Sequence, residues 1–268
     1  MMQLILHVTA VILYGLSGLY YWRELGKPGA RSWRPAVAFG TAAVLLQGAV
    51  LAGDLDQGGR LVLGIGIILS LDAWAVAAIF LAASARKPIG NLGAFIMPTA
   101  ALAAIGEIFL PLHPQAVPAG DPWLIVHVVV SILAYSLLAI AVVQSLMLWL
   151  QERRLRRKQP AQLMRALPPM ETMESLMFEM IRVGFILLTL TLISGFFFSD
   201  RLFGKPLSVS HHSIFALIAW LVFAILLLGR WRFGWRGRNA VRWTVGGFVL
   251  LVFAYLSAQF LLKLAIIH

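Results

Sequence analysis

One histidine of the chain stands in a setting that suits ligand binding. His127 belongs to the apolar stretch that begins Trp123-Leu-Ile-Val-His127, and Ser131 and Ala134 follow it one and two helical turns later. On a helix these residues share a face, so the imidazole would stand above a strip of small side chains. Imidazole is a common ligand of metals and of haem iron, and a flat ligand needs such space. The alternative is a histidine that is bonded to a loop carbonyl in a packed bundle.

Two neighbouring histidines, His211 and His212, stand at the start of another apolar run. Successive residues of a helix point about 100° apart, so at most one of the two imidazoles readily faces the bundle. Either could supply a second axial ligand opposite His127. Alternatively, both cap the helix or face lipid headgroups.

An acidic residue stands in the middle of a third apolar run, in the sequence Asp72-Ala-Trp74. A carboxylate at membrane depth is costly and is a candidate transport or proton-transfer site. It can also be protonated, or bonded to an amide such as Gln47 or Gln144 on another run. We expect a structural or protonated Asp72, because the chain has no detectable internal repeat of the kind that many transporters carry.

These residues are carried by apolar segments that are long enough to cross a membrane. The chain of 268 residues is 60% hydrophobic and 12% charged, with a mean hydropathy of +0.87, which excludes an ordinary soluble protein. A spanning helix needs roughly 20 apolar residues. Such runs lie at about 3–21, 35–53, 61–84, 92–110, 123–150, 174–199, 210–229 and 241–266. We therefore predict an all-α protein: a single integral membrane domain, residues 1–268, folded as a polytopic bundle of about eight transmembrane helices.

The distribution of basic residues orients these helices. Of the 22 Lys and Arg residues, 17 lie in the first, third, fifth and seventh gaps between the runs, counting Arg242 at the flank of the seventh gap. Positively charged loops stay in the cytoplasm, so we predict that both termini lie outside. All six histidines, among them His7, His113 and His268, then lie toward the outer side. The alternative explanation is chance, together with the tolerance of histidine for the headgroup region.

Charge and composition also limit the kind of function. The net charge of +11 follows from the bias of the loops and from attraction to anionic lipid, so we expect membrane lipid and no nucleic acid as a partner. The absence of cysteine excludes thiol–disulfide chemistry, covalent haem attachment through Cys-x-x-Cys-His and a thiolate metal site. The sequence offers no nucleophile–base or acid–base pair, so we expect no enzymatic activity.

Three segments of the chain resemble a known family. They are Trp123-Leu-x-x-His127-Val with Ala134-Tyr135 after it, Leu167-Pro-Pro-Met170 with Ser194-Gly195 after it, and Gly234-Trp-Arg-Gly-Arg238 with Ala254-Tyr255 after it. Together they resemble the cytochrome c assembly family (CcsA/CcmC type) of integral membrane proteins, in its YpjD/HemX-like branch. The resemblance covers about residues 60–266 and is strongest from 120 to 260.

The resemblance implies haem handling at the outer face, in support of c-type cytochrome maturation, with His127 at the position of a haem ligand. The better-known branches also carry a tryptophan-rich, haem-presenting loop before the penultimate helix. The corresponding residues here, 200–210, include no tryptophan. The chain therefore lacks the signature for direct presentation of haem to an apocytochrome.

Three functions remain open on the sequence alone. The first is a haem-binding or haem-trafficking protein of the bacterial inner membrane, which holds haem b non-covalently and works with cytochrome c maturation proteins. Its candidate site residues are His127 as first ligand, His212, His211 or His268 as second ligand, Ser131 and Trp123 near the first ligand, and Arg60, Arg201 and Lys205 for the haem propionates. The second function is a haem-free membrane scaffold or regulator, and the third is a small-molecule transporter that uses Asp72.

Overall fold

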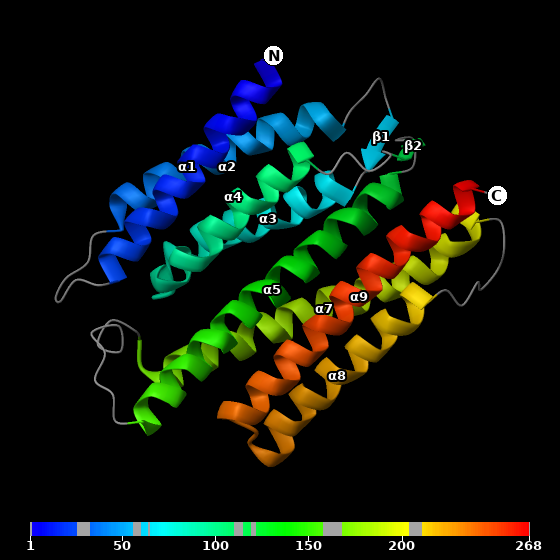
Figure 1. The fold of residues 1–268 in the computed structure, drawn as a ribbon. Helices are drawn as coiled ribbons and strands as arrows, with labels where there is room; N and C mark the ends of the chain where they lie inside the picture. Colours follow the sequence, from blue (N-terminus) through cyan, green and yellow to red (C-terminus); the bar gives the residue numbers. More distant parts are fainter. Residues whose placement is uncertain are drawn as a thin grey trace. The chain divides into compact units, whose positions relative to one another are not determined.

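The computed structural model describes residues 2–25, 33–55, 60–63, 65–109, 115–118, 122–157, 168–203 and 211–267. Within these ranges, eight helices are long and apolar enough to cross a membrane, which confirms the predicted helix bundle. They are α1 (Met2–Leu25), α2 (Arg34–Leu55), α3 (Ile65–Ser84), α4 (Gly93–Phe109), α5 (Pro122–Arg156), α7 (Met170–Phe203), α8 (His211–Phe233) and α9 (Gly237–Ile267) (Figure 1). A short 3-10 turn, η1 (Gly90–Leu92), precedes α4.

The helices match the predicted runs in number and order, with one difference at the third run. That run was predicted from residue 61, whereas α3 begins at Ile65, because Arg60–Leu63 forms a strand, β1. β1 pairs with β2 (Gln115–Pro118) in an antiparallel ribbon, with Arg60 opposite Pro118. Hydropathy did not predict the ribbon, because a short apolar segment fits a strand and a helix equally well.

The chain forms two compact units. Unit 1 contains Met1–Pro122 and Arg154–Pro169, and unit 2 contains Trp123–Arg153 and Met170–His268. The boundaries fall near the two ends of α5, which at 35 residues is the longest of the described helices. The assignment of the whole chain to one membrane domain stays a prediction.

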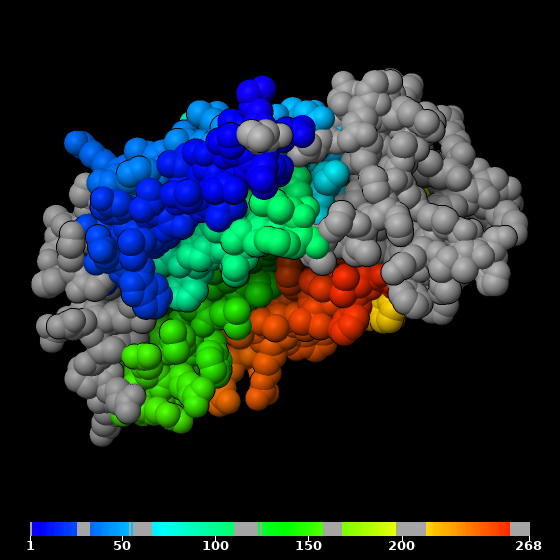
Figure 2. Space-filling model, turned by 45° about the horizontal axis from the view of Figure 1, so that its top comes forward, coloured from blue at the N-terminus to red at the C-terminus, as the bar shows by residue number. Residues whose placement is uncertain are grey.

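In unit 1, α1 packs closely against α4, and Figure 2 shows the two helices side by side, α1 in blue and α4 in green. Glycines make this approach possible. A methyl group on Gly18 would lie 2.8 Å from the ring of Pro98, and one on Gly93 would lie 2.5 Å from the ring of Tyr21. Small residues serve this purpose in membranes, where helix association depends on van der Waals packing of close backbones.

Hydrogen bonds made by side chains join α2 to α3 around Asp72. Gln47 Nε2 donates to Ser70 Oγ at 2.6 Å, and Trp74 Nε1 donates to the carbonyl oxygen of Val44 at 2.8 Å. Gln47 was one of the partners considered for Asp72. Its amide nitrogen thus donates to Ser70, which lies two residues before Asp72 on α3. Such bonds satisfy polar groups that the hydrocarbon core of a membrane cannot satisfy.

In unit 2, α8 and α9 form a hairpin around the Gly-Trp-Arg-Gly-Arg string. Gly234 and Gly237 have φ angles of 62° and 55°, a conformation that disfavours any side chain. The ring of Trp235 lies on Gly229, where a methyl group would come within 2.5 Å of it. The glycines and the tryptophan of this string therefore build the turn between two helices.

An ion pair attaches α7 to this hairpin. Arg230 Nη1 donates to Glu174 Oε1, and the guanidinium lies 4.7 Å from the centroid of the Phe178 ring. The side chains of Glu174 and Arg230 are 13% and 28% exposed. Arg236 Nε lies 3.8 Å from the same carboxylate oxygen, but its side chain is 67% exposed. The half-buried pair, with its aromatic cover, is therefore the main electrostatic contact at this end of unit 2.

Helices α5 and α7 run side by side in opposite directions within unit 2 (Figure 1). Gln144 Nε2 donates to the carbonyl oxygen of Met173 at 3.1 Å. Further along, a methyl group on Gly184 would lie 2.9 Å from the side chain of Leu138, so Leu138 of α5 packs on the backbone of α7. This antiparallel packing brings the start of α5 to the end of α7.

Candidate functional site: the His127–Ser194 pair

His127 lies on α5, little more than one turn from the helix start at Pro122, and it is half-buried. Its ring atom Nδ1 lies 2.7 Å from Oγ of Ser194 on α7. The two residues are 67 positions apart in the chain. The contact therefore depends on the packing of α5 against α7.

The bonds of Ser194 determine which nitrogen of His127 carries the proton. Ser194 Oγ also donates to the carbonyl oxygen of Thr191 at 3.1 Å. A hydroxyl group has a single proton to donate, so both bonds are satisfied together only when Nδ1–H donates to Ser194 Oγ. A neutral His127 then carries its lone pair on Nε2. Ligating histidines are commonly held in this way, with one nitrogen on an outer partner and the other on the metal.

The same bonds bear on whether the pair could act as a nucleophile and a base. A histidine that activates a serine must accept the proton of the hydroxyl group. With Nδ1 protonated, His127 donates to Ser194 and does not withdraw its proton. The bond therefore orients the imidazole and does not activate the serine as a nucleophile.

A glycine of α7 lies beside the imidazole. Gly195 follows Ser194, and a methyl group on it would lie 3.4 Å from Cε1 of His127, the carbon between the two ring nitrogens. Ser131 Oγ donates to the carbonyl oxygen of His127 at 2.7 Å, so this hydroxyl is used by the backbone of α5. Ala134 is fully buried. The residue that the structure places at the edge of the ring is thus the glycine on α7.

Contacts with α8 hold α7 five residues before Ser194. Trp220 Nε1 donates to Thr189 Oγ1 at 2.9 Å. The Trp220 ring also stacks on Phe185, with centroids 5.3 Å apart and planes 25° apart. These contacts restrict the rotation of α7 about its axis and therefore help to keep Ser194 on the side that faces His127.

The structure places the other predicted site residues less fully. α8 begins at His211, so His211 and His212 stand at a helix start as the sequence predicted, but their side chains lie outside the described residues. Figure 1 shows this start at the same end of unit 2 as the start of α5. Trp123, in the first turn of α5, is 65% exposed, which fits an interfacial anchor. The side chains of four further candidates also lie outside the described residues: His268, Arg60, Arg201 and Lys205.

His7 and His113 are the two remaining histidines of the chain. His7 lies on α1, in unit 1, and is nearly buried, while His113 lies outside the described residues. Among the residues that the structure describes, no three His, Cys, Asp or Glu side chains form a group that could hold a metal ion. The site thus offers one oriented imidazole, and two more histidines at a neighbouring helix start.

Sequence reasoning did not identify Ser194 as a site residue, although Ser194-Gly195 belongs to a segment that resembles the family. Apolar residues occur on every side of a membrane helix, so periodicity does not tell which face of α7 meets α5. The available signal was a small polar residue next to a glycine, near the end of a helix that runs antiparallel to the helix of His127. Small and hydroxyl-bearing residues of this kind are enriched where membrane helices meet.

Comparisons with known proteins agree with the resemblance. Residues 62–266 match the family model described as Cytochrome C assembly protein. The chain is 29% identical over 248 residues to the inner membrane protein YpjD of Escherichia coli (strain K12), covering 91% of this chain and 88% of the relative. It is 28% identical over 265 residues to an uncharacterized 28.8 kDa protein in the nifR3-like 5′ region of Azospirillum brasilense, covering 96% of each.

A protein with a functional name is also similar. Over 221 residues, the chain is 29% identical to the cytochrome c biogenesis protein CcsA of Prochlorococcus marinus (strain NATL2A), covering 69% of this chain and 68% of the relative. The region matched by the family model includes both His127 and Ser194. It also includes the Gly-Trp-Arg-Gly-Arg turn of unit 2. The chain therefore belongs to the cytochrome c assembly protein family.

Proposed function

We propose that this protein handles haem at the outer face of a bacterial inner membrane and thereby supports the assembly of c-type cytochromes. The observation that carries the proposal is the bond between His127 Nδ1 and Ser194 Oγ, 2.7 Å long. It orients the imidazole and puts the lone pair on Nε2, which is what an axial ligand of haem iron needs. Membership of the family, and the similarity to a protein named for cytochrome c biogenesis, support the same function.

The residues around His127 fit a non-covalently held haem b. His127 would bind the iron through Nε2, and Gly195 leaves space beside the ring. Large apolar side chains next to this pair, Val126, Ile193 and Phe196, are exposed and can contact the flat porphyrin. The second axial ligand in the proposal is His212, His211 or His268. Haem is the cargo in this function, and the protein binds it, orients it and passes it to a maturation partner.

The basic end of unit 2 supports the proposed orientation in the membrane. The ends of α5 and α8 and the stretch that leads into α9 carry five arginines there: Arg153, Arg230, Arg232, Arg236 and Arg238. Positively charged ends stay in the cytoplasm. Because α5 runs from His127 toward Arg153, His127 then lies near the outer face. The similarity to a protein named as an inner membrane protein supports that location.

The experiment is an absorption spectrum of the full chain, purified in detergent, with and without added haemin. We expect a Soret band for the parent protein and its loss or strong reduction in His127→Ala, with protein abundance near normal. His127→Gly should regain the band when imidazole is added to the buffer, because free imidazole can occupy the vacated ligand position. His7→Ala, which removes an imidazole from α1, is the matched control and should keep the band.

Two results would overturn the proposal. If His127→Ala binds haem as well as the parent, the site lies elsewhere. If the parent binds no haem under any of these conditions, the protein keeps the fold without the ligand and acts as a membrane scaffold or regulator.

A further inference from the structure

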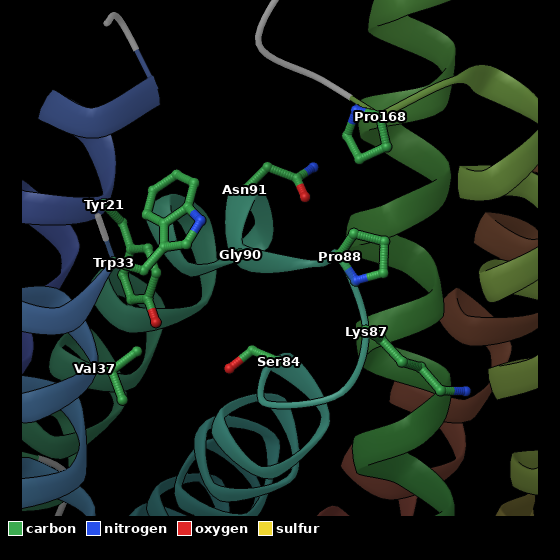
Figure 3. Close-up of a pocket in the computed structure, with 9 residues that line it drawn as sticks. All are labelled: Tyr21, Trp33, Val37, Ser84, Lys87, Pro88, Gly90, Asn91 and Pro168. Atoms are coloured by element: carbon green, nitrogen blue, oxygen red, sulfur yellow. The ribbon is translucent and has the colours of Figure 1, made fainter. Parts of the chain in front are cut away.

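A cavity of about 250 Å³ lies at the basic end of unit 1. It is formed where α1 ends, α2 begins and the turn after α3 leads into η1, with one residue from the segment before α7. Its lining residues are Tyr21, Trp33, Val37, Ser84, Lys87, Pro88, Gly90, Asn91 and Pro168 (Figure 3). None of them belongs to the His127 site, so a ligand of this cavity is independent of the proposed haem function.

The cavity contains a buried donor. Tyr21 has no exposed surface, and its hydroxyl has no hydrogen-bond partner among the residues that the structure describes. Figure 3 shows this hydroxyl directed toward the space between Trp33, Val37 and Ser84. Burial of a hydroxyl group without a partner is unfavourable, so this hydroxyl is able to donate to a ligand atom that accepts a hydrogen bond.

A second polar group faces the same space. Figure 3 shows the Ser84 hydroxyl directed toward it, with the Trp33 ring along one side, whereas the Asn91 amide points toward Pro168. Asn91 is buried, since only 4% of its surface is exposed. Ser84 Oγ donates to the carbonyl oxygen of Leu81 at 2.8 Å, so toward the cavity this oxygen can act as an acceptor. The lining therefore suits a ligand that carries both acceptor oxygens and hydroxyl groups.

The charge around the cavity favours an anion. None of the nine lining residues is acidic. Three exposed arginines stand on the helix ends and the turn around it: Arg23, Arg34 and Arg86. The ammonium of Lys87 points away from the centre in Figure 3, so it acts on a ligand through its field at the rim.

Exposed aromatic residues mark the depth of the cavity in the membrane. Trp22 on α1 and Phe95 on α4 are exposed. Trp22 follows the lining residue Tyr21 in the sequence, and Phe95 lies four residues after the lining residue Asn91. Their rings meet edge to face, with centroids 6.0 Å apart. Tryptophan and basic residues gather at the level of the lipid headgroups. The anion present at the highest local concentration at this level is the headgroup of an anionic phospholipid.

We propose that the cavity binds the headgroup of an anionic phospholipid such as phosphatidylglycerol. The Tyr21 hydroxyl donates to a phosphate oxygen. Ser84 Oγ accepts from a glycerol hydroxyl, and the Trp33 ring covers the headgroup. A lipid held in this way joins the ends of α1, α2 and α3 at the membrane surface.

The test measures lipid binding to the full chain in detergent. Native mass spectrometry counts retained phosphatidylglycerol, and the rise in melting temperature on addition of its dioctanoyl form gives the affinity. Tyr21→Phe removes only the hydroxyl group and should weaken binding about tenfold, as expected for loss of a hydrogen bond to a charged group. Tyr14→Phe is the matched control, because Tyr14 is on the same helix, equally buried and without a hydroxyl partner among the described residues, but does not line the cavity.

A second variant tests the position of the Trp33 ring. A methyl group on Gly90 would lie 2.8 Å from Trp33 Nε1, so Gly90→Ala must displace the ring and should also weaken binding. Gly15→Ala, where a methyl group meets nothing within 4 Å, should leave binding unchanged. Equal effects of Tyr21→Phe and Tyr14→Phe would overturn the proposal, as would equal binding of phosphatidylcholine. An equal rise in melting temperature with glycerol phosphate or inorganic phosphate alone would assign the cavity to a soluble phosphate and overturn the proposal of a lipid site.

Discussion

The role of Ser194 gives the sharpest test of the haem site. Ser194→Ala removes the acceptor of the 2.7 Å bond from His127 Nδ1 and leaves the imidazole in place. The ring is then free to rotate about its side-chain bonds and to exchange the proton between its two nitrogens. The preference for the orientation and tautomer that present Nε2 as a ligand is weakened when this bond is lost. We therefore expect weaker haem binding without loss of the ligand itself.

The expected loss of affinity is moderate, because Ser194 bonds to the ligand His127 and does not bind the iron itself. Removal of the hydrogen-bond partner of a ligating histidine typically lowers metal affinity about 10- to 100-fold. This range corresponds to about 1.4–2.8 kcal/mol of binding free energy. The other bond of Ser194, to the carbonyl oxygen of Thr191, lies within α7, so its loss affects only a local contact of that helix.

The assay is a haemin titration of the purified protein, followed at the Soret band. Ser194→Thr keeps a hydroxyl group and should stay close to the parent. Ser131→Ala is the matched control, because its hydroxyl donates to the backbone carbonyl oxygen of His127, whereas Ser194 bonds to the ring. The role of Ser194 in orienting the imidazole would be refuted by one result. In it, Ser194→Ala and Ser131→Ala bind haemin with affinities within twofold of each other, while His127→Ala still loses binding.

Three further predictions concern stability and orientation. Arg230→Met should lower the free energy of unfolding by about 2 kcal/mol, less than the ~3–5 kcal/mol lost when a fully buried ion pair is broken. Arg236 is exposed, so Arg236→Met should leave the melting temperature nearly unchanged. A larger effect of Arg236→Met than of Arg230→Met would contradict this ranking. Gly93→Ala places a methyl group 2.5 Å from the Tyr21 ring and should lower the free energy of unfolding by about 1–3 kcal/mol. Gly15 has open space around it, so Gly15→Ala should be neutral or slightly stabilising. Equal melting temperatures of the two variants would argue against the close contact of α1 with α4. Reporter fusions at Arg236 should read cytoplasmic and a fusion at Pro118 external, and the reverse pattern would move His127 to the inner side.

The elements that carry the site could be predicted from sequence, because membrane helices are specified locally. A run of about 20 apolar residues is sufficient to define a spanning helix. Each of the eight runs contains a helix long enough to span a membrane, and α8 begins at His211, next to the predicted start of its run. The place of His127 just inside the start of α5 follows from the same local signal.

Contacts between elements were not predictable in this way. Ser194 meets His127 across 67 residues, and β1 pairs with β2 across a similar stretch of chain. The cavity of unit 1 likewise needs Tyr21, Trp33 and Asn91 together, although they lie on different elements. Length and hydropathy are properties of one segment, and they decide whether it becomes a helix in a membrane. The rotation and depth of each helix against its neighbours depend on close packing at glycines and on hydrogen bonds between helices, so only the tertiary structure decides which polar groups meet.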